Sequence, residues 1–113
     1  MNRKRLIIVK ELPIIQPNEN IDFASYVHQF KALADEKRLL IMNILTRNGK
    51  TCVCDLEVEV NLPQSKLSYH LKILYKAGFI HKETKGTWSY YWINETVVNS
   101  ILSEDLCCLF RPN

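Results

Sequence analysis

Residues 52–78 read CVCDLEVEVNLPQSKLSYHLKILYKAG, and the spacing of their apolar side chains predicts two helices separated by a turn. The first helix is short, beginning at Cys54 or Asp55 and ending near Glu59. It would bury Leu56 and Val60. A turn is expected over residues 61–63, Asn-Leu-Pro, because proline rarely continues a helix that has already begun.

The second helix of this stretch is longer and has two distinct faces. Leu67, Leu71 and Leu74 fall on one stripe at helical spacing, and Gly78 is placed to end the helix. His70 lies near the leucine stripe, so we expect it to pack against the body of the protein. A helix, a tight turn and a second helix with a polar outer face are typical of a helix-turn-helix.

The next segment changes to a pattern that is typical of strands. Residues 79–84 and 87–93 are rich in aromatic and β-branched side chains, and Lys85-Gly86 between them predicts a hairpin turn. A hairpin after a helix-turn-helix is a winged helix, which binds duplex DNA with its second helix and its hairpin. The side chains expected to reach bases or phosphates are Gln64, Ser65, Lys66, Ser68, Tyr69, Lys72, Lys82 and Lys85.

Three further helices are expected around this unit. Apolar residues from Phe23 to Leu33 follow a helical period, Asp35 is a good N-cap for an apolar helix that stops at Gly49, and Asn94 caps a terminal helix. The first and last of these carry apolar stripes that one small core cannot cover. We therefore expect a homodimer through these two helices, and a fold that is mainly α with a β-hairpin.

The length and the charge of the chain limit the number of domains and the kinds of partner. With 113 residues and a net charge of +3, the chain is long enough for one domain and mildly basic, which permits a nucleic-acid partner. We expect an N-terminal arm over 1–19 and a single domain over 20–113. No signal peptide or membrane span is expected, so the predicted location is the cytoplasm, where thiols stay reduced. No CxxC redox motif, glycine-rich phosphate loop or paired acid–base set indicates an enzyme.

Four segments together resemble the ArsR/SmtB family of metalloregulatory repressors: FKALADEKRLLIMNIL, CVCDL, QSKLSYHLKILYKAGFI and KGTWSYYWIN, in this order. The resemblance covers residues 23–110 and is strongest to repressors of arsenical-resistance operons. It implies a cytoplasmic, dimeric winged-helix protein that occupies its own operator. Binding of a metal or metalloid would release the operator DNA.

The cysteines are the candidate sensing residues. Cys54 falls at or beside the predicted helix start, where unpaired N–H groups lower a thiol pKa, and Cys52 can fold back toward it. Soft thiolates suit soft thiophilic ions. In the family this CxC motif senses metalloids, although arsenic repressors often have a third cysteine where this chain has Glu57. Cys107 and Cys108 resemble C-terminal thiols of other arsenic-responsive members.

These thiols predict trivalent arsenic or antimony, inorganic or methylated, as the inducer. A zinc site of the family's last-helix type is not expected, because residues 94–110 contain no histidine. Two alternatives use the same cysteines differently. One is a winged-helix DNA-binding protein switched by thiol oxidation, and the other is a module stapled by zinc through all four thiolates.

Overall fold

The computed structural model describes residues 21–103 and Phe110. The described part of the chain contains five helices and three strands. In chain order these are α1 (Phe23–Leu33), α2 (Glu36–Asn48), β1 (Thr51–Cys52), α3 (Val53–Val60), α4 (Gln64–Lys76), β2 (Ile80–Lys85), β3 (Trp88–Ile93) and α5 (Glu95–Ile101).

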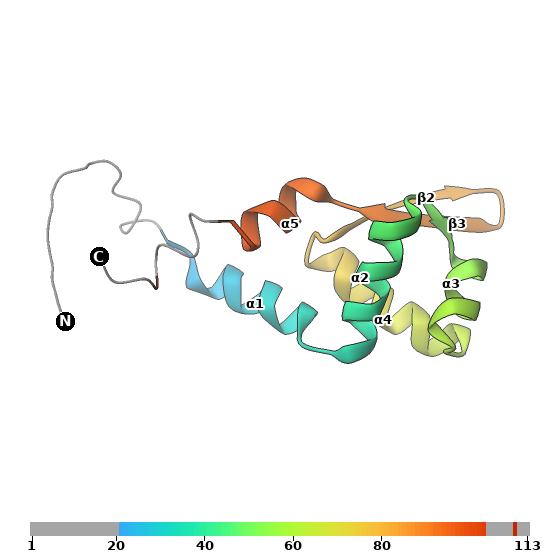
Figure 1. Cartoon of the computed structure of the whole chain (residues 1–113), viewed down its shortest axis with the longest axis horizontal. Helices are drawn as coiled ribbons and strands as arrows, with labels where there is room; N and C mark the ends of the chain where they lie inside the picture. The colour runs from blue at the N-terminus through green and yellow to red at the C-terminus, as the bar shows by residue number, and fades with distance from the viewer. Residues whose placement is uncertain (1–20, 104–109, 111–113) are drawn as a thin grey trace, which may run out of the picture.

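Helix α2 lies in the middle of the molecule, with α1 toward one end and the β2–β3 hairpin extending to the other (Figure 1). Helices α3 and α4 form the helix-turn-helix, and β2 pairs with β3 in antiparallel register from Ile80 and Ile93 to Lys85 and Trp88. Strand β1 adds a third strand to the hairpin, in the order β1-β3-β2. The predicted winged helix-turn-helix, mainly α with a β-hairpin, is confirmed.

One apolar core holds these elements together. The three leucines of α4 are at most 1 % exposed, and Leu56 and Val60 of α3 are equally buried, as the sequence predicts. Ile41, Ile44 and Leu45 from α2 complete the centre, with Phe79 between α4 and the hairpin. Full burial of each large aliphatic side chain contributes about 1.5–3 kcal/mol. The amphipathic pattern of α4 therefore decides which of its faces turns inward.

The helix ends follow their capping residues. The Asp35 carboxylate accepts hydrogen bonds from the backbone N–H groups of Lys37 and Arg38, and the Asn94 amide oxygen accepts one from Val97. Gly49 ends α2 with a φ of 74°, a conformation that favours glycine. The predicted starts of α2 and α5 and the predicted stop of α2 are all confirmed.

Three local features differ from the sequence-based expectation. The hairpin turn is Gly86-Thr87 and not Lys85-Gly86, because Lys85 still pairs with Trp88 and Gly86 supplies the positive φ of 61°. Helix α3 begins at Val53, since Cys52 serves as its N-cap. Strand β1 was not expected as part of the sheet. Its pairing with β3 joins segments about 40 residues apart, a register that local patterns do not reveal.

The predicted arm over 1–19 and the residues 104–109 of the expected terminal helix lie outside the described residues. In the part that is described, α5 ends at Ile101. Apolar side chains stay exposed on α1, where Phe23, Val27 and Phe30 are 44–56 % exposed, and Leu102 after α5 is 69 % exposed. Within residues 21–103 and Phe110, no helix has the length and apolar character needed to cross a bilayer.

The N-cap of α2 yields a stability prediction. Asp35→Ala should lower the free energy of unfolding by about 0.5–2 kcal/mol, because two backbone N–H groups lose their acceptor. Asp35→Asn should lose less at neutral pH, since asparagine caps equally well. Thermal denaturation of the two variants beside the natural chain measures both effects. Equal losses in the two variants would argue against a capping role.

The same residue yields a pH prediction. The hydrogen bond from the backbone of Arg38, followed by the charge of its guanidinium, holds the pKa of Asp35 below its ordinary value of 3.8, against an opposing effect of burial. A depressed pKa stabilises the folded state above the ordinary value, and this contribution is lost as the pH falls through the folded-state pKa. The stability advantage over Asp35→Asn should therefore shrink below pH 3.8. Denaturant titrations over a pH series check this, and an advantage independent of pH would contradict it.

Candidate nucleic-acid interface and thiol site

Helix α4 presents its polar side to solvent. Its leucines point into the core, so the positions on the opposite side of the helix are left outside, and Tyr69 is 61 % exposed. The predicted contact residues on this helix all lie on the solvent side: Gln64, Ser65, Lys66, Ser68, Tyr69 and Lys72. An exposed helix face that carries hydroxyl, amide and ammonium groups has the donors and acceptors needed to read base edges in a major groove.

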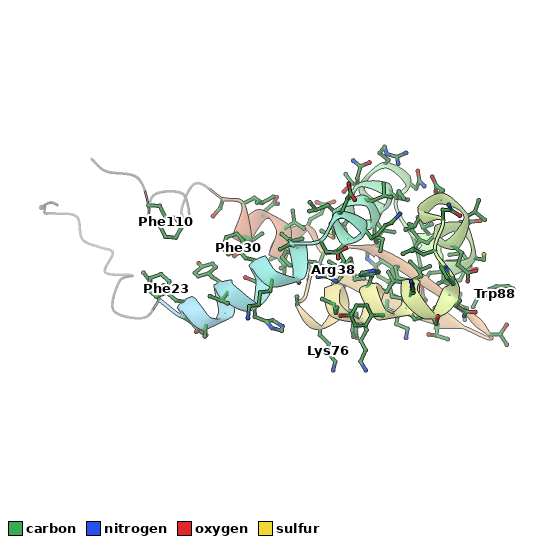
Figure 2. All side chains as sticks on the ribbon, turned by 90° about the horizontal axis from the view of Figure 1, so that it is seen from below. Phe23, Phe30, Arg38, Lys76, Trp88 and Phe110 are labelled. Atoms are coloured by element: carbon green, nitrogen blue, oxygen red, sulfur yellow. The ribbon has the colours of Figure 1, made fainter. Side chains whose placement is uncertain are left out.

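The two predicted lysines of the hairpin are both exposed, but they lie on opposite faces of β2. Side chains alternate along a strand, so Lys82 shares a face with the buried Ile80, whereas Lys85 shares the other face with His81. Lys85 stands next to the turn, opposite Trp88. Figure 2 shows Trp88 at the end of the molecule that is remote from Phe23 and Phe30. Of the two lysines, Lys85 is therefore better placed to contact a phosphate from the tip of the hairpin.

A charged and aromatic cluster on the hairpin was missed by the sequence analysis. The Lys50 ammonium, just before β1, forms an ion pair with Glu83 and lies 4.9 Å from the ring centroid of Trp92. The hydrogen bond from Lys50 lowers the pKa of Glu83. This cluster joins the chain leading into the cysteines to the hairpin. Only the β1–β3 register could have revealed it.

His70 of α4 packs against the body of the protein, as expected. Its side chain is 13 % exposed, and its Nδ1 atom lies 3.0 Å from a guanidinium nitrogen of Arg38. Arg38 also donates through Nε to the carbonyl of Ala32, at 2.6 Å. This contact between α2 and α4 has no signal in the sequence, because 32 residues separate the partners.

Cys52 and Cys54 meet at the start of α3. Their sulfur atoms lie 2.6 Å apart, and the backbone N–H of Cys54 points at the Cys52 sulfur at 3.4 Å. Both thiols are free; Cys52 is 8 % exposed and Cys54 is half-buried. The expectation that Cys52 folds back toward Cys54 is confirmed. Cys52, rather than Cys54, occupies the N-cap, and Cys54 is the second residue of the helix.

The electrostatics of Cys54 differ from the prediction. A hydrogen bond with Cys52 is the largest cause that raises the pKa of the Cys54 thiol, followed by burial and by the negative charges of Cys52 and Asp55. The expected lowering at the helix start is therefore wrong. The Cys54 S–H donates to the Cys52 sulfur, so ionising Cys54 would break this hydrogen bond. A ligand held by both sulfur atoms as thiolates must displace both thiol protons, including the one in this hydrogen bond.

Two sulfur donors in contact suit a soft ion that bonds to thiolates, because both sulfur atoms can reach one centre. An ion bound to two thiolates at about 2.3 Å would hold the sulfur atoms roughly 3.3–3.8 Å apart, which is wider than the present 2.6 Å. Among the described residues, no group of three or more His, Cys, Asp or Glu side chains could hold a metal ion. Cys107 and Cys108, the other predicted ligands, lie outside the described residues.

The sequence of the chain matches a known family of proteins. Residues 35–82 match the family described as bacterial regulatory protein, arsR family. Over 86 residues the chain is 64 % identical to the arsenical resistance operon repressor of Bacillus subtilis (strain 168), which covers 76 % of this chain and 82 % of that protein. It is 31 % identical over 83 residues to the cadmium resistance transcriptional regulatory protein CadC of Listeria innocua serovar 6a, covering 74 % and 70 % of the two chains.

A solved structure supports the fold independently. The homodimeric winged helix-turn-helix DNA-binding domain Mb0332 from Mycobacterium bovis superposes with a TM-score of 0.64. It is 24 % identical in sequence and covers 76 % of this chain and 80 % of that one. The shared architecture therefore does not depend on close sequence similarity.

The identity to the Bacillus subtilis repressor extends well beyond the matched helix-turn-helix, and the exposed face of α4 beside a β-hairpin is the arrangement of a DNA-binding regulator and not of an enzyme. The chain belongs to the arsR family of bacterial regulatory proteins and is a winged-helix transcriptional repressor.

Proposed function

We propose that this repressor binds the operator of an arsenic-resistance operon and is released when trivalent arsenic or antimony binds its cysteine thiolates. The observation that carries the proposal is the contact between Cys52 and Cys54 at the start of the helix-turn-helix. The similarity to an arsenical resistance operon repressor at 64 % identity supports the choice of operon and inducer. We place the protein in the cytoplasm, where operator DNA and reduced thiols occur together.

DNA reading is assigned to α4 and the hairpin. Ser68 and Tyr69 lie on the exposed face of α4, and Gln64, Ser65 and Lys66 occupy its first turn, where a recognition helix meets base edges. Lys72, Lys82 and Lys85 supply positive charge for phosphates. The exposed positions on one helix face support this assignment.

We assign the inducer as a soft trivalent metalloid that binds thiolates. Trivalent arsenic forms three bonds, so Cys52 and Cys54 account for two of them, and Cys107 or Cys108 is the candidate for the third. A methylated arsenical needs only two thiolates, since carbon takes one bond. Each pair of thiols is therefore sufficient for a methylated arsenical.

Cys52 couples the thiol pair to both parts of the DNA-binding unit. It is the N-cap of α3, which precedes the turn into α4, and it is also a residue of β1, opposite Tyr90 in the hairpin. Spreading the two sulfur atoms around a bound centre changes the geometry of the N-cap. We infer that this displaces the hairpin and α3, together with the α4 that follows it, so that α4 and the hairpin no longer fit their sites on the DNA at the same time.

We propose a homodimer through α1 and the C-terminal helix. Phe23, Val27 and Phe30 place three large apolar side chains on the solvent side of α1, and Phe110 lies at the same end of the molecule (Figure 2). Such an exposed stripe is typical of an interface between subunits. The similarity to a homodimeric winged-helix domain supports the assignment. The regulatory domain spans 20–113 in this proposal, with 1–19 as an arm.

One alternative switch has a specific observation in its favour. The contact between the free thiols of Cys52 and Cys54 is also the arrangement from which two electrons and two protons can be removed to form a disulfide. A peroxide would then replace the metalloid as the signal. The zinc-stapled alternative requires all four cysteines in one site and predicts unfolding when zinc is removed.

The DNA assignment predicts a residue-specific loss of affinity. Ser68→Ala or Tyr69→Ala should weaken operator binding by about 1–3 kcal/mol if the side chain reads a base edge. Tyr75→Ala is the matched control, because Tyr75 is also exposed on α4 but points about 120° away from Tyr69. Fluorescence anisotropy with operator and unrelated duplexes measures the losses. Normal operator affinity in both Ser68→Ala and Tyr69→Ala would show that α4 is not part of the DNA interface.

The lysine at the hairpin tip predicts a different signature. Lys85→Ala should weaken binding to all duplexes alike, because a phosphate contact carries no sequence information. The slope of log affinity against log salt should fall by about 0.9 for each phosphate that the variant no longer neutralises. Lys31→Ala, a change of an exposed lysine on α1, is the control. A salt slope that does not change in Lys85→Ala would argue against a phosphate contact by the hairpin.

The dimer assignment predicts that Phe23→Ser/Phe30→Ser sediments as a 13.2 kDa monomer at micromolar concentration, whereas the natural chain sediments at twice that mass. Val58→Ser, which changes a side chain that is 80 % exposed on α3, should leave the dimer intact. Equal sedimentation of all three proteins as dimers would exclude α1 from the interface.

The inducer assignment predicts that Cys52→Ser/Cys54→Ser keeps operator binding but loses most of its release by arsenite. Serine is a favourable N-cap residue, so α3 should still form. Cys107→Ser/Cys108→Ser should show a weaker response or none. Operator release is titrated with arsenite, methylarsenite, antimonite, cadmium and zinc under reducing conditions, and with peroxide in a parallel series. Release by peroxide alone would establish the oxidation switch in place of the metalloid sensor.

A further inference from the structure

Arg38 lies where three helices meet. Its side chain is 11 % exposed, and in Figure 2 it appears in the middle of the molecule, between the exposed aromatic residues of α1 and the hairpin tip. The guanidinium donates to the carbonyl of Ala32 at 2.6 Å and to that of Lys31 at 3.4 Å, both in the last turn of α1. Its burial excludes Arg38 from direct contact with DNA.

The remaining guanidinium contact reaches α4. Nη1 of Arg38 lies 3.0 Å from Nδ1 of His70 and 4.0 Å from the carboxylate of Asp35. A guanidinium has donors and no acceptor, so Nδ1 of His70 must accept. A substitution that keeps this contact must therefore place an acceptor at the Nδ1 position. Asp35, the N-cap of α2, also lies near the ring, with its Oδ1 at 3.9 Å from Nδ1.

In the described part of the chain, His70 is the only residue of α4 whose side chain has a hydrogen bond or ion pair with another element. The other inward contacts of α4 come from apolar side chains such as Leu67, Leu71 and Leu74. Apolar burial has no preferred direction, so it resists withdrawal of the helix more strongly than rotation about its own axis. A hydrogen bond is directional and opposes that rotation.

Small rotations matter on the exposed face. Side chains extend about 5 Å from the helix axis, so a rotation of roughly 20° moves their ends by about 2 Å. Hydrogen bonds to base edges tolerate only about 0.5 Å in length. The exposed side chains of α4 therefore need a defined rotation of the helix in order to meet the bases.

We propose that the Arg38–His70 hydrogen bond sets the rotation of α4, which makes Arg38 and His70 positioning residues that determine operator specificity without touching DNA. The inference rests on the proposed reading of bases by α4. Because Arg38 also binds the last turn of α1, the same side chain ties the recognition helix to the helix that carries the proposed dimer interface. The spacing and the orientation of the two reading helices in a dimer would both depend on it.

The test compares variants that remove or keep the acceptor at Nδ1. His70→Leu and Arg38→Met remove the hydrogen bond, while His70→Asn places its amide oxygen where Nδ1 lies and keeps an acceptor. We expect His70→Leu and Arg38→Met to lose tenfold or more in operator affinity, with binding to unrelated duplex and its salt slope within twofold of the natural chain. His70→Asn should stay within threefold for both. The double variant Arg38→Met/His70→Leu should lose no more than the worse single variant.

Melting temperature and sedimentation accompany each affinity measurement, so that a structural loss is recognised. Should His70→Leu fail to fold, His70→Gln serves in its place, because its amide reaches toward the Nε2 position and leaves Nδ1 without a replacement. An unchanged ratio of operator to unrelated-duplex affinity in the acceptor-free variants would overturn the proposal, whether both affinities stay normal or both fall equally. A failure of His70→Asn to retain the ratio of the natural chain would overturn it as well.

The same assay separates this inference from the function on which it rests. Normal operator binding by Ser68→Ala and Tyr69→Ala would overturn DNA reading by α4 and the positioning role with it. Losses in those two variants, combined with a normal affinity ratio in His70→Leu, would overturn the positioning role alone.

Discussion

Burial of the leucine stripe of α4 organises the whole molecule. Leu67, Leu71 and Leu74 are at most 1 % exposed, and at about 1.5–3 kcal/mol each they contribute a large share of what holds a small domain together. Turning this stripe inward leaves the hydroxyl, amide and ammonium groups of α4 outside. The surface that we propose for DNA is therefore a consequence of core formation.

The thiol pair lies at the junction of the elements that this core holds together. Cys52 ends the short strand beside the hairpin and caps α3, so one side chain takes part in a sheet contact and in a helix start. Cys54 lies two residues farther along the chain, and its thiol donates a hydrogen bond to the Cys52 sulfur. In the proposed switch, a ligand at this position would act on β1 and α3 together, because the pair belongs to the backbone segment that joins them.

Polar contacts supply the precision that apolar packing lacks. The Lys50–Glu83 ion pair ties the start of β1 to the hairpin, and the Arg38–His70 contact ties α2 to α4. The first is exposed and contributes little to stability in water. The second is largely buried, so loss of either partner leaves a polar group unsatisfied. Loss of the buried contact should therefore cost more stability than loss of the exposed one. The buried contact is also the one that reaches α4.

Local patterns in the sequence were sufficient to predict the five helices, the hairpin, the faces of α4 and the caps at Asp35 and Asn94, because periodicity and capping depend on residues within one or two turns of each other. They also indicated that Cys52 and Cys54 meet. That Cys52 caps α3 and that the thiol of Cys54 has a raised pKa are local effects of where α3 begins, which the sequence pattern placed at Cys54 or Asp55. The pairing of β1 with β3 came from long-range packing instead. The pairing of Arg38 with His70 and of Lys50 with Glu83 belongs to the same group. Each depends on side chains or strands brought together by burial of the core, and such distances are not encoded in any local pattern.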